Sequence, residues 1–136
     1  MDTIRVGHIS AINYSAGTAR VVYTDRDEEV TQEIPFLDSE YKMPEIGALV
    51  AVAHLSNGSA VGIILGRPWS DKHKPPESGT ALYRKDLGQA AGDAVIKYDG
   101  KTLTISTTGG LMLSDGECST TLKSLLDRIK ALEAKP

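Results

Sequence analysis

The chain has 136 residues, of which 40% are hydrophobic, and its formal net charge is −3. This size allows one domain with an appendage, and the slightly acidic balance argues against a broad phosphate-binding surface, which needs clustered Lys and Arg. The single cysteine, Cys118, excludes a disulfide framework within one chain. Because neither a signal-peptide pattern nor an apolar run of bilayer length is visible, we expect a soluble protein made in the cytosol.

The first half of the chain predicts short antiparallel strands. A Gly-bearing loop at 15–17 separates two strand-like runs, which indicates a hairpin. A charged turn over 25–29 leads to a predicted strand over 30–36, which ends near Pro35 because proline cannot donate to a strand ladder. Residues 41–47 predict a loop that leads into the next hairpin.

The strongest local signal is Asn57-Gly58 between two apolar runs, because a two-residue type I′ turn needs positive φ at both central residues. Such a turn fixes the register of its two strands. The side chains expected to fill the interior then face one another in three pairs: Val52 with Ile63, Val50 with Leu65, and His54 with Val61.

The opposite face of this predicted hairpin carries Leu49, Ala60 and Ile64 together with three small residues. We expect Ala51, Ala53 and Gly62 to form a close-contact face, because small side chains let another surface approach the backbone. Since neither face is polar, both are expected to be covered.

Short antiparallel strands with Gly-rich turns in about 65 residues predict a five-stranded OB-fold barrel over residues 1–68, with an SH3-like barrel as the rival. The following segment, GRPWSDKHKPPESG, has three prolines and no aliphatic residue. This composition is typical of a stiff, exposed connector, and we place it at 69–80.

Residues 81–116 are again β-like, with Asp99-Gly100 as a second predicted hairpin turn. That turn would place Ile96 opposite Leu103 and Ala94 opposite Ile105, and a three-residue loop at 108–110 would add a third strand on the same apolar face. The resulting stripe consists of Ile96, Leu103, Ile105, Leu111 and Leu113. A lone ribbon is marginal in water, so the stripe must meet other chains or the barrel.

Residues 117–136 predict an amphipathic helix. Leu122, Leu125, Ile129 and Leu132 are spaced three, four and three residues apart, as a and d positions of two heptads. Ser119 or Thr120 can cap its start, but a helix this short is marginal alone. Two interpretations remain: the ribbon and helix self-associate around a common axis, or they fold back onto their own prism or barrel.

Three stretches resemble the phage baseplate assembly protein V family, the central spikes of contractile tails, which are related to the valine-glycine-repeat spikes of type VI secretion. They are IRVGHISAINYSAGTARVVY, YKMPEIGALVAVAHLSNGSAVGIILGRPW and PPESGTALYRKD. The resemblance covers residues 4 to about 115. It implies an N-terminal OB-fold followed by a short trimeric, intertwined β-helix or β-prism. Ala51, Ala53 and Gly62 would then let three barrels approach one another closely.

The resemblance also implies a function: a homotrimeric spike at the distal end of a phage or bacteriocin-like tail, made in the bacterial host cytoplasm. Its partners would be two further copies, tail hub or tube proteins and, transiently, the target envelope. Either a separate tip protein caps the prism or the helix forms a trimeric stalk. Some family members carry a His-x-His iron site, but this chain has only His8, His54 and His73, so no metal or cofactor is expected.

No catalytic pattern accompanies these features. The chain has no Gly-x-Ser-x-Gly elbow, zinc-ligand spacing or Walker motif, so we expect a structural protein rather than an enzyme. The alternative is an OB-fold nucleic-acid binder, which would need stacking aromatics and a positive groove. The barrel offers Tyr14, Tyr23, Phe36 and Tyr41, but its basic residues alternate with acidic ones, so no nucleic acid is expected as a partner.

Overall fold

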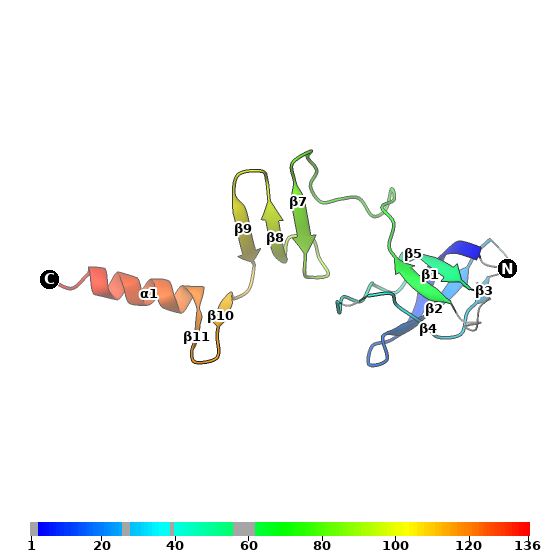
Figure 1. The fold of residues 1–136 in the computed structure, drawn as a ribbon, viewed down its shortest axis with the longest axis horizontal. Helices are drawn as coiled ribbons and strands as arrows, with labels where there is room; N and C mark the ends of the chain where they lie inside the picture. The colour runs from blue at the N-terminus through cyan, green and yellow to red at the C-terminus, as the bar shows by residue number, and fades with distance from the viewer. Residues whose placement is uncertain (1–2, 26–27, 39, 56–61) are drawn as a thin grey trace. The chain divides into compact units, whose positions relative to one another are not determined.

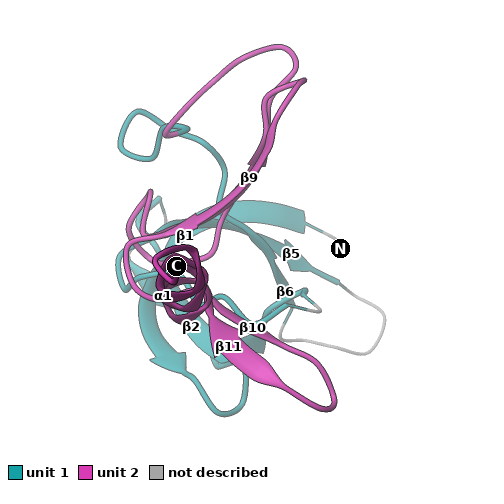
Figure 2. Ribbon diagram, turned by 90° about the vertical axis from the view of Figure 1, so that its left-hand side faces the viewer, with its two compact units in different colours: residues 1–75 teal, residues 76–136 magenta. Residues whose placement is uncertain are grey.

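The computed structural model describes residues 3–25, 28–38, 40–55 and 62–136. The chain forms two compact units, residues 1–75 and 76–136, and their boundary lies inside the predicted connector (Figure 2). The described residues are mostly β-sheet with one short helix near the C-terminus (Figure 1), which confirms the predicted combination of β-structure and a C-terminal helix.

The first unit is a single curved sheet. Its strands are β1 (Thr3–Asn13), β2 (Thr18–Tyr23), β3 (Glu29–Val30), β4 (Ile34–Pro35), β5 (Leu49–His54) and β6 (Ile63–Gly66). They are ordered β3-β2-β1-β5-β6, and β4 also pairs with β2. A parallel bridge between Phe36 and Ile64, with Leu37 N donating to Ile64 O at 2.9 Å, closes the sheet on itself.

The first predicted hairpin is confirmed, since β1 pairs with β2 through a loop in which Gly17 has a φ of 67°. The loop at 41–47 is confirmed as well. The predicted strand over 30–36 is instead divided into β3 and β4. The register against β2 shifts by one residue between them, where Val21 N donates to the Thr31 hydroxyl at 3.0 Å.

Alternating residues of these strands form one core. Its buried members are Ile9, Ala19, Val21, Tyr23, Ile34, Ala48, Val50, Val52 and Ile64. Gly7 also faces this interior. A Cβ there would lie 2.6 Å from Val21 Cγ1 and 2.7 Å from Val22 O, so only glycine lets β1 pass this close to β2.

The predicted register of β5 against β6 was wrong by one residue. Val52 lies opposite Ile64, and Ala53 lies opposite Ile63. Val50 and Val52 face the core as predicted. A one-residue slip moves a whole strand to the other face, so Ile64 is buried in place of Ile63, and Leu65 is 41% exposed. The Asn57-Gly58 turn, Ala60 and Val61 lie outside the described residues.

The second unit contains two small sheets and a helix. Strands β7 (Tyr83–Asp86), β8 (Ala94–Tyr98) and β9 (Leu103–Thr107) form one antiparallel sheet; β10 (Met112–Ser114) and β11 (Ser119–Thr121) form the other; and α1 spans Leu122–Glu133. Strand β7 lies within the predicted β-like segment 81–116, although no individual strand had been placed at these residues. It pairs with β8 and so widens the expected ribbon.

The β8–β9 hairpin has a longer loop than predicted. Ile96 lies opposite Ile105 instead of Leu103, and Ala94 lies opposite Thr107 instead of Ile105. The Asp99 carboxylate explains the longer loop, because it accepts hydrogen bonds from the backbone N–H groups of residues 101 and 102, both at 2.8 Å. The shift is two residues, so Ile96, Leu103 and Ile105 still share one face.

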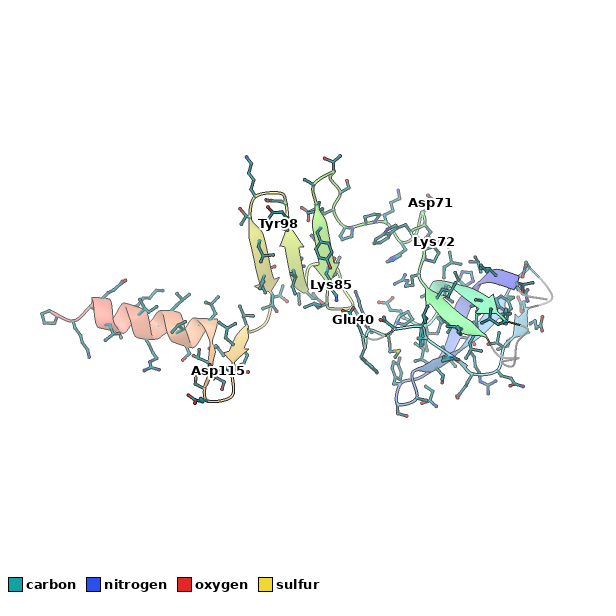
Figure 3. The ribbon with its side chains drawn as sticks, viewed as in Figure 1. Glu40, Asp71, Lys72, Lys85, Tyr98 and Asp115 are labelled. Atoms are coloured by element: carbon teal, nitrogen blue, oxygen red, sulfur yellow. The ribbon has the colours of Figure 1, made fainter. Side chains whose placement is uncertain are left out.

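The predicted pairing of residues 111–113 with β9 was wrong. Strand β10 pairs with β11, and the Asp115 carboxylate holds the turn between them by accepting from Glu117 N at 2.8 Å and Cys118 N at 3.0 Å (Figure 3). The helix therefore begins later than predicted, and its cap is Thr121 rather than Ser119 or Thr120. The Thr121 hydroxyl accepts from Ser124 N at 3.0 Å.

Candidate assembly interface

One face of the β7-β8-β9 sheet is apolar and exposed. Directly opposed residues of antiparallel strands share a face, and the pairings therefore place five large side chains together: Tyr83, Ile96, Tyr98, Leu103 and Ile105. We call these five residues the exposed stripe; Ile96, in the central strand, is half-buried and the other four are exposed. Leu103 is 63% exposed and Ile105 55%, and Figure 3 labels Tyr98, which ends β8. Lys85 lies on the same face at the edge strand.

The opposite face of this sheet is occupied by charges from the same unit. Arg84 donates to both carboxylate oxygens of Asp86 at 2.9 Å and to Glu77 at 2.9 Å, and Lys97 donates to Glu77 at 3.2 Å. These hydrogen bonds lower the pKa of the Glu77 carboxyl and raise that of the Arg84 guanidinium. Val95, on this face, is the one buried side chain of residues 76–136.

The two faces of this sheet therefore differ in whether their side chains find partners within the same chain. The charged face pairs its groups internally, whereas the exposed stripe leaves its apolar area in water. Burial of apolar area is favourable by about 25 cal/mol per Å². A partner therefore gains more from covering the stripe than from covering the charged face.

The structure brings together three of the five predicted trimer-core residues, Ile96, Leu103 and Ile105. Leu113 lies in the β10–β11 hairpin, and Leu111 is half-buried just before β10. Tyr83 and Tyr98 were missed. The alternation Ala94, Ile96, Tyr98 carried a signal for Tyr98. For Tyr83 the signal was only that it falls in the β-like segment 81–116, without a pattern that placed a strand there.

The predicted helix seam is also exposed. Leu122, Leu125, Ile129 and Leu132 all lie in water, and α1 has no buried residue. Leu126, which the heptad reading missed, is exposed too and widens the seam. On the polar side, Lys123 pairs with Asp127 at 2.7 Å.

The predicted close-contact face of the barrel divides into two parts. Ala51 and Ala53 are half-buried and lie opposite Val6 and Ile4, both exposed, so an apolar strip runs across β1 and β5. At position 62 the barrel's own backbone requires glycine, because φ is 102° and a Cβ would lie 2.6 Å from Ala53 O.

Several polar and aromatic side chains of residues 1–75 contact one another. His54 Nε2 and the Tyr23 hydroxyl share a hydrogen bond of 2.6 Å, and the Arg5 guanidinium lies 3.8 Å from the Tyr23 ring centroid. Burial raises the pKa of Tyr23. Trp69 stacks on His73 with ring centroids 4.8 Å apart and is itself mostly exposed.

Two further kinds of site are absent from the described part of the chain. It contains no cluster of three or more His, Cys, Asp or Glu that could hold a metal ion. No helix in it combines the length and apolar character needed to cross a membrane.

Neither the models of known protein families nor the sequences of curated proteins match this chain.

Proposed function

We propose that this chain is a non-enzymatic subunit of a homotrimeric spike at the distal end of a contractile phage or phage-like tail. The spike links the tail hub or tube to the tip and enters the target envelope when the sheath contracts. The observation that carries the proposal is the exposed stripe. Residues 76–136 bury a single side chain of their own, while one face of the β7-β8-β9 sheet carries the half-buried Ile96 and four exposed large side chains, Tyr83, Tyr98, Leu103 and Ile105.

The energetics favour an associated state. Full burial of a large apolar side chain contributes about 1.5–3 kcal/mol, so a half-exposed one such as Leu103 or Ile105 gains roughly 1 kcal/mol when a partner covers it. A small sheet without a second layer is only marginally stable. Covering the stripe supplies the second layer that this unit lacks.

A second copy of the same chain is a suitable partner, since it presents the same apolar stripe. Around a threefold axis each stripe can face inward while Glu77, Arg84 and Lys97 stay in water. Many strand hydrogen bonds would then have to break together under axial load, which suits a piercing device. The threefold symmetry itself is taken from the resemblance to the baseplate assembly protein V family.

The topology of the first unit supports the OB-fold part of the proposal. Counting β3 and β4 as one broken strand gives five strands, with β1 between β2 and β5. The parallel contact of Phe36 with Ile64 brings the third and fifth strands together. This arrangement is typical of a five-stranded Greek-key barrel. In the spike, the barrels would contact the tail hub.

Of the four aromatics that could stack on nucleic acid, Tyr14 and Tyr41 are exposed, whereas the other two are occupied within the barrel. Tyr23 is buried and shares its hydroxyl with His54, and Phe36 packs against the core, so neither offers a free ring for stacking. Salt-sensitive retardation of single-stranded DNA in a gel would nevertheless revive that function.

The mass of the full chain in solution tests the proposal. Light scattering at micromolar concentration is expected to give three times the 14.5 kDa chain. The double variant Leu103→Asp plus Ile105→Asp should dissociate to monomers, because it places charges in the stripe.

The control is Ser106→Asp, which lies opposite Val95 on the other face of the same strand and should leave the mass unchanged. A monomeric parent protein, or a double variant that keeps the parent's mass, would overturn the proposal.

A further inference from the structure

Helix α1 presents an apolar face that its own chain leaves uncovered. The four seam residues and Leu126 run along its length and are all exposed. A helix of this length, 12 residues, is marginal alone, since about 12–15 residues are needed even for good helix formers. The question is which surface covers this face, and in which orientation.

The start of α1 is fixed by the β10–β11 hairpin. Thr121 is both the last residue of β11 and the N-cap of the helix, and Leu122 N donates to Leu111 O at 2.9 Å. No linker separates strand and helix. If three copies associate around a threefold axis, symmetry makes their helices point the same way along that axis, and the assembly holds them at a high effective concentration.

The charges flanking the seam favour the same orientation. With Leu122 and Ile129 at a and Leu125 and Leu132 at d, Arg128 falls at g and Glu133 at the following e. In a parallel, in-register coil, g of one helix lies beside the next e of its neighbour, so Arg128 meets Glu133. In an antiparallel pair, g faces g, and Arg128 would meet another Arg128.

Neither of these two charges is used within its own chain. The residues are five apart, which does not bring them together on one helix, and no ion pair in the described structure involves either one. Lys123 and Asp127, by contrast, lie on the outer face and pair with each other at 2.7 Å. The charges on the outer face therefore pair within one helix, whereas the apolar seam and the flanking Arg128 and Glu133 are complementary to a second copy.

We infer that α1 packs against α1 of the other copies as a parallel, in-register bundle, with Arg128 of one copy paired to Glu133 of its neighbour. This inference rests on the proposed self-association and adds its orientation and register. In this arrangement the helix forms a stalk and does not fold back onto its own chain.

Cysteine cross-linking of the full chain tests the orientation. In a Cys118→Ser background, Leu132→Cys places thiols at a d position near the end of the bundle, where parallel helices bring them together. In an antiparallel pair the two thiols would be about 15 Å apart, too far for a disulfide. Lys130→Cys, on the outer face of the same turn, is the matched control.

In a glutathione redox buffer, the Leu132→Cys chain should form covalent dimers at least fivefold faster than the Lys130→Cys chain. Equal rates for the two variants would overturn the inference.

Charge reversal tests the register. Arg128→Glu alone and Glu133→Arg alone should each raise the trimer dissociation constant about tenfold, since three like-charged pairs form in a trimer. The double reversal should restore most of the loss, which isolates the interchain coupling from changes within each helix. Reversing Lys123 and Asp127 together should leave the constant within about twofold.

The outcomes separate this inference from the proposed function. A trimeric parent whose two reversals are simply additive would retain the spike and overturn the parallel bundle. A monomeric parent would overturn the proposed function, and with it the inference. Coupled reversals together with selective cross-linking at position 132 support both.

Discussion

The two units are both built mainly from antiparallel strands, yet only one of them makes a core. In residues 1–75 the sheet closes through Phe36 and Ile64, so alternate side chains such as Val21 and Val52 point into a shared interior. In residues 76–136 the sheets stay small and open, and only Val95 is buried. The difference teaches that closure, rather than apolar content, separates a self-sufficient unit from one that needs partners.

Gly7→Ala tests the closed first unit, and we expect it to have the largest effect because it should destabilise the barrel. The added Cβ would lie 2.6 Å from Val21 Cγ1 and 2.7 Å from a backbone oxygen, so β1 must move away from β2. We expect a loss of about 3 kcal/mol in barrel stability, measured by denaturant unfolding. Gly109→Ala, whose Cβ would have its nearest neighbour at 3.8 Å, is the control and should change stability by less than about 0.5 kcal/mol.

Leu125→Asp combined with Ile129→Asp tests the comparison in the second unit, residues 76–136. Both residues lie on the seam and neither contributes to the barrel core, so the helix should lose its association while the barrel stays folded. Circular dichroism should show loss of helical signal with the β signal retained. If the β signal disappears as well, the helix belongs to the barrel and the separation of the units is wrong.

Tyr23→Phe sharpens the comparison by probing a polar contact inside the closed unit. The variant removes the hydroxyl that shares a 2.6 Å hydrogen bond with His54. Barrel stability should fall by about 1 kcal/mol, the usual net value of such a bond, while the mass of the assembly stays the same. Thermal unfolding with light scattering checks both; a change in mass would tie the barrel to the assembly.

Acidification should produce the smallest effect, a loss of stability in the second unit, residues 76–136. Hydrogen bonds from Arg84 and Lys97 hold the pKa of Glu77 below its ordinary 4.5 in the folded chain. The charged form therefore stabilises residues 76–136 above about pH 4.5, and this contribution is lost as the pH falls through the lowered pKa. Glu77→Gln should flatten that part of the pH dependence of unfolding. An unchanged profile would show that the network contributes nothing measurable.

Several elements could be predicted because a single local cause fixes each of them. The first hairpin follows from Gly17, which takes a positive φ, and the inward positions of Val50 and Val52 follow from simple alternation. The helix follows from the heptad spacing of its leucines. In these cases no distant residue had to be known.

The remaining features depend on competition between local signals or on distant pairing. Asp99 and Asp115 accept backbone hydrogen bonds in their turns, which lengthened one hairpin and created another. Thr121 rather than Ser119 became the cap because residues 119–121 are held in β11. Tyr83 joined the exposed stripe only through its pairing with Tyr98, and neither residue reveals that pairing in the sequence.

The direct passage from β11 into α1 at Thr121 has a mechanical consequence. With no slack at this junction, a twist of the hairpin turns the helix by the same angle, so torque passes from one to the other. One extra residue inserted after Thr121 would rotate the leucine face by about 100°. The leucines determine which side of the helix is apolar, and the number of residues at this junction determines the direction in which that side points.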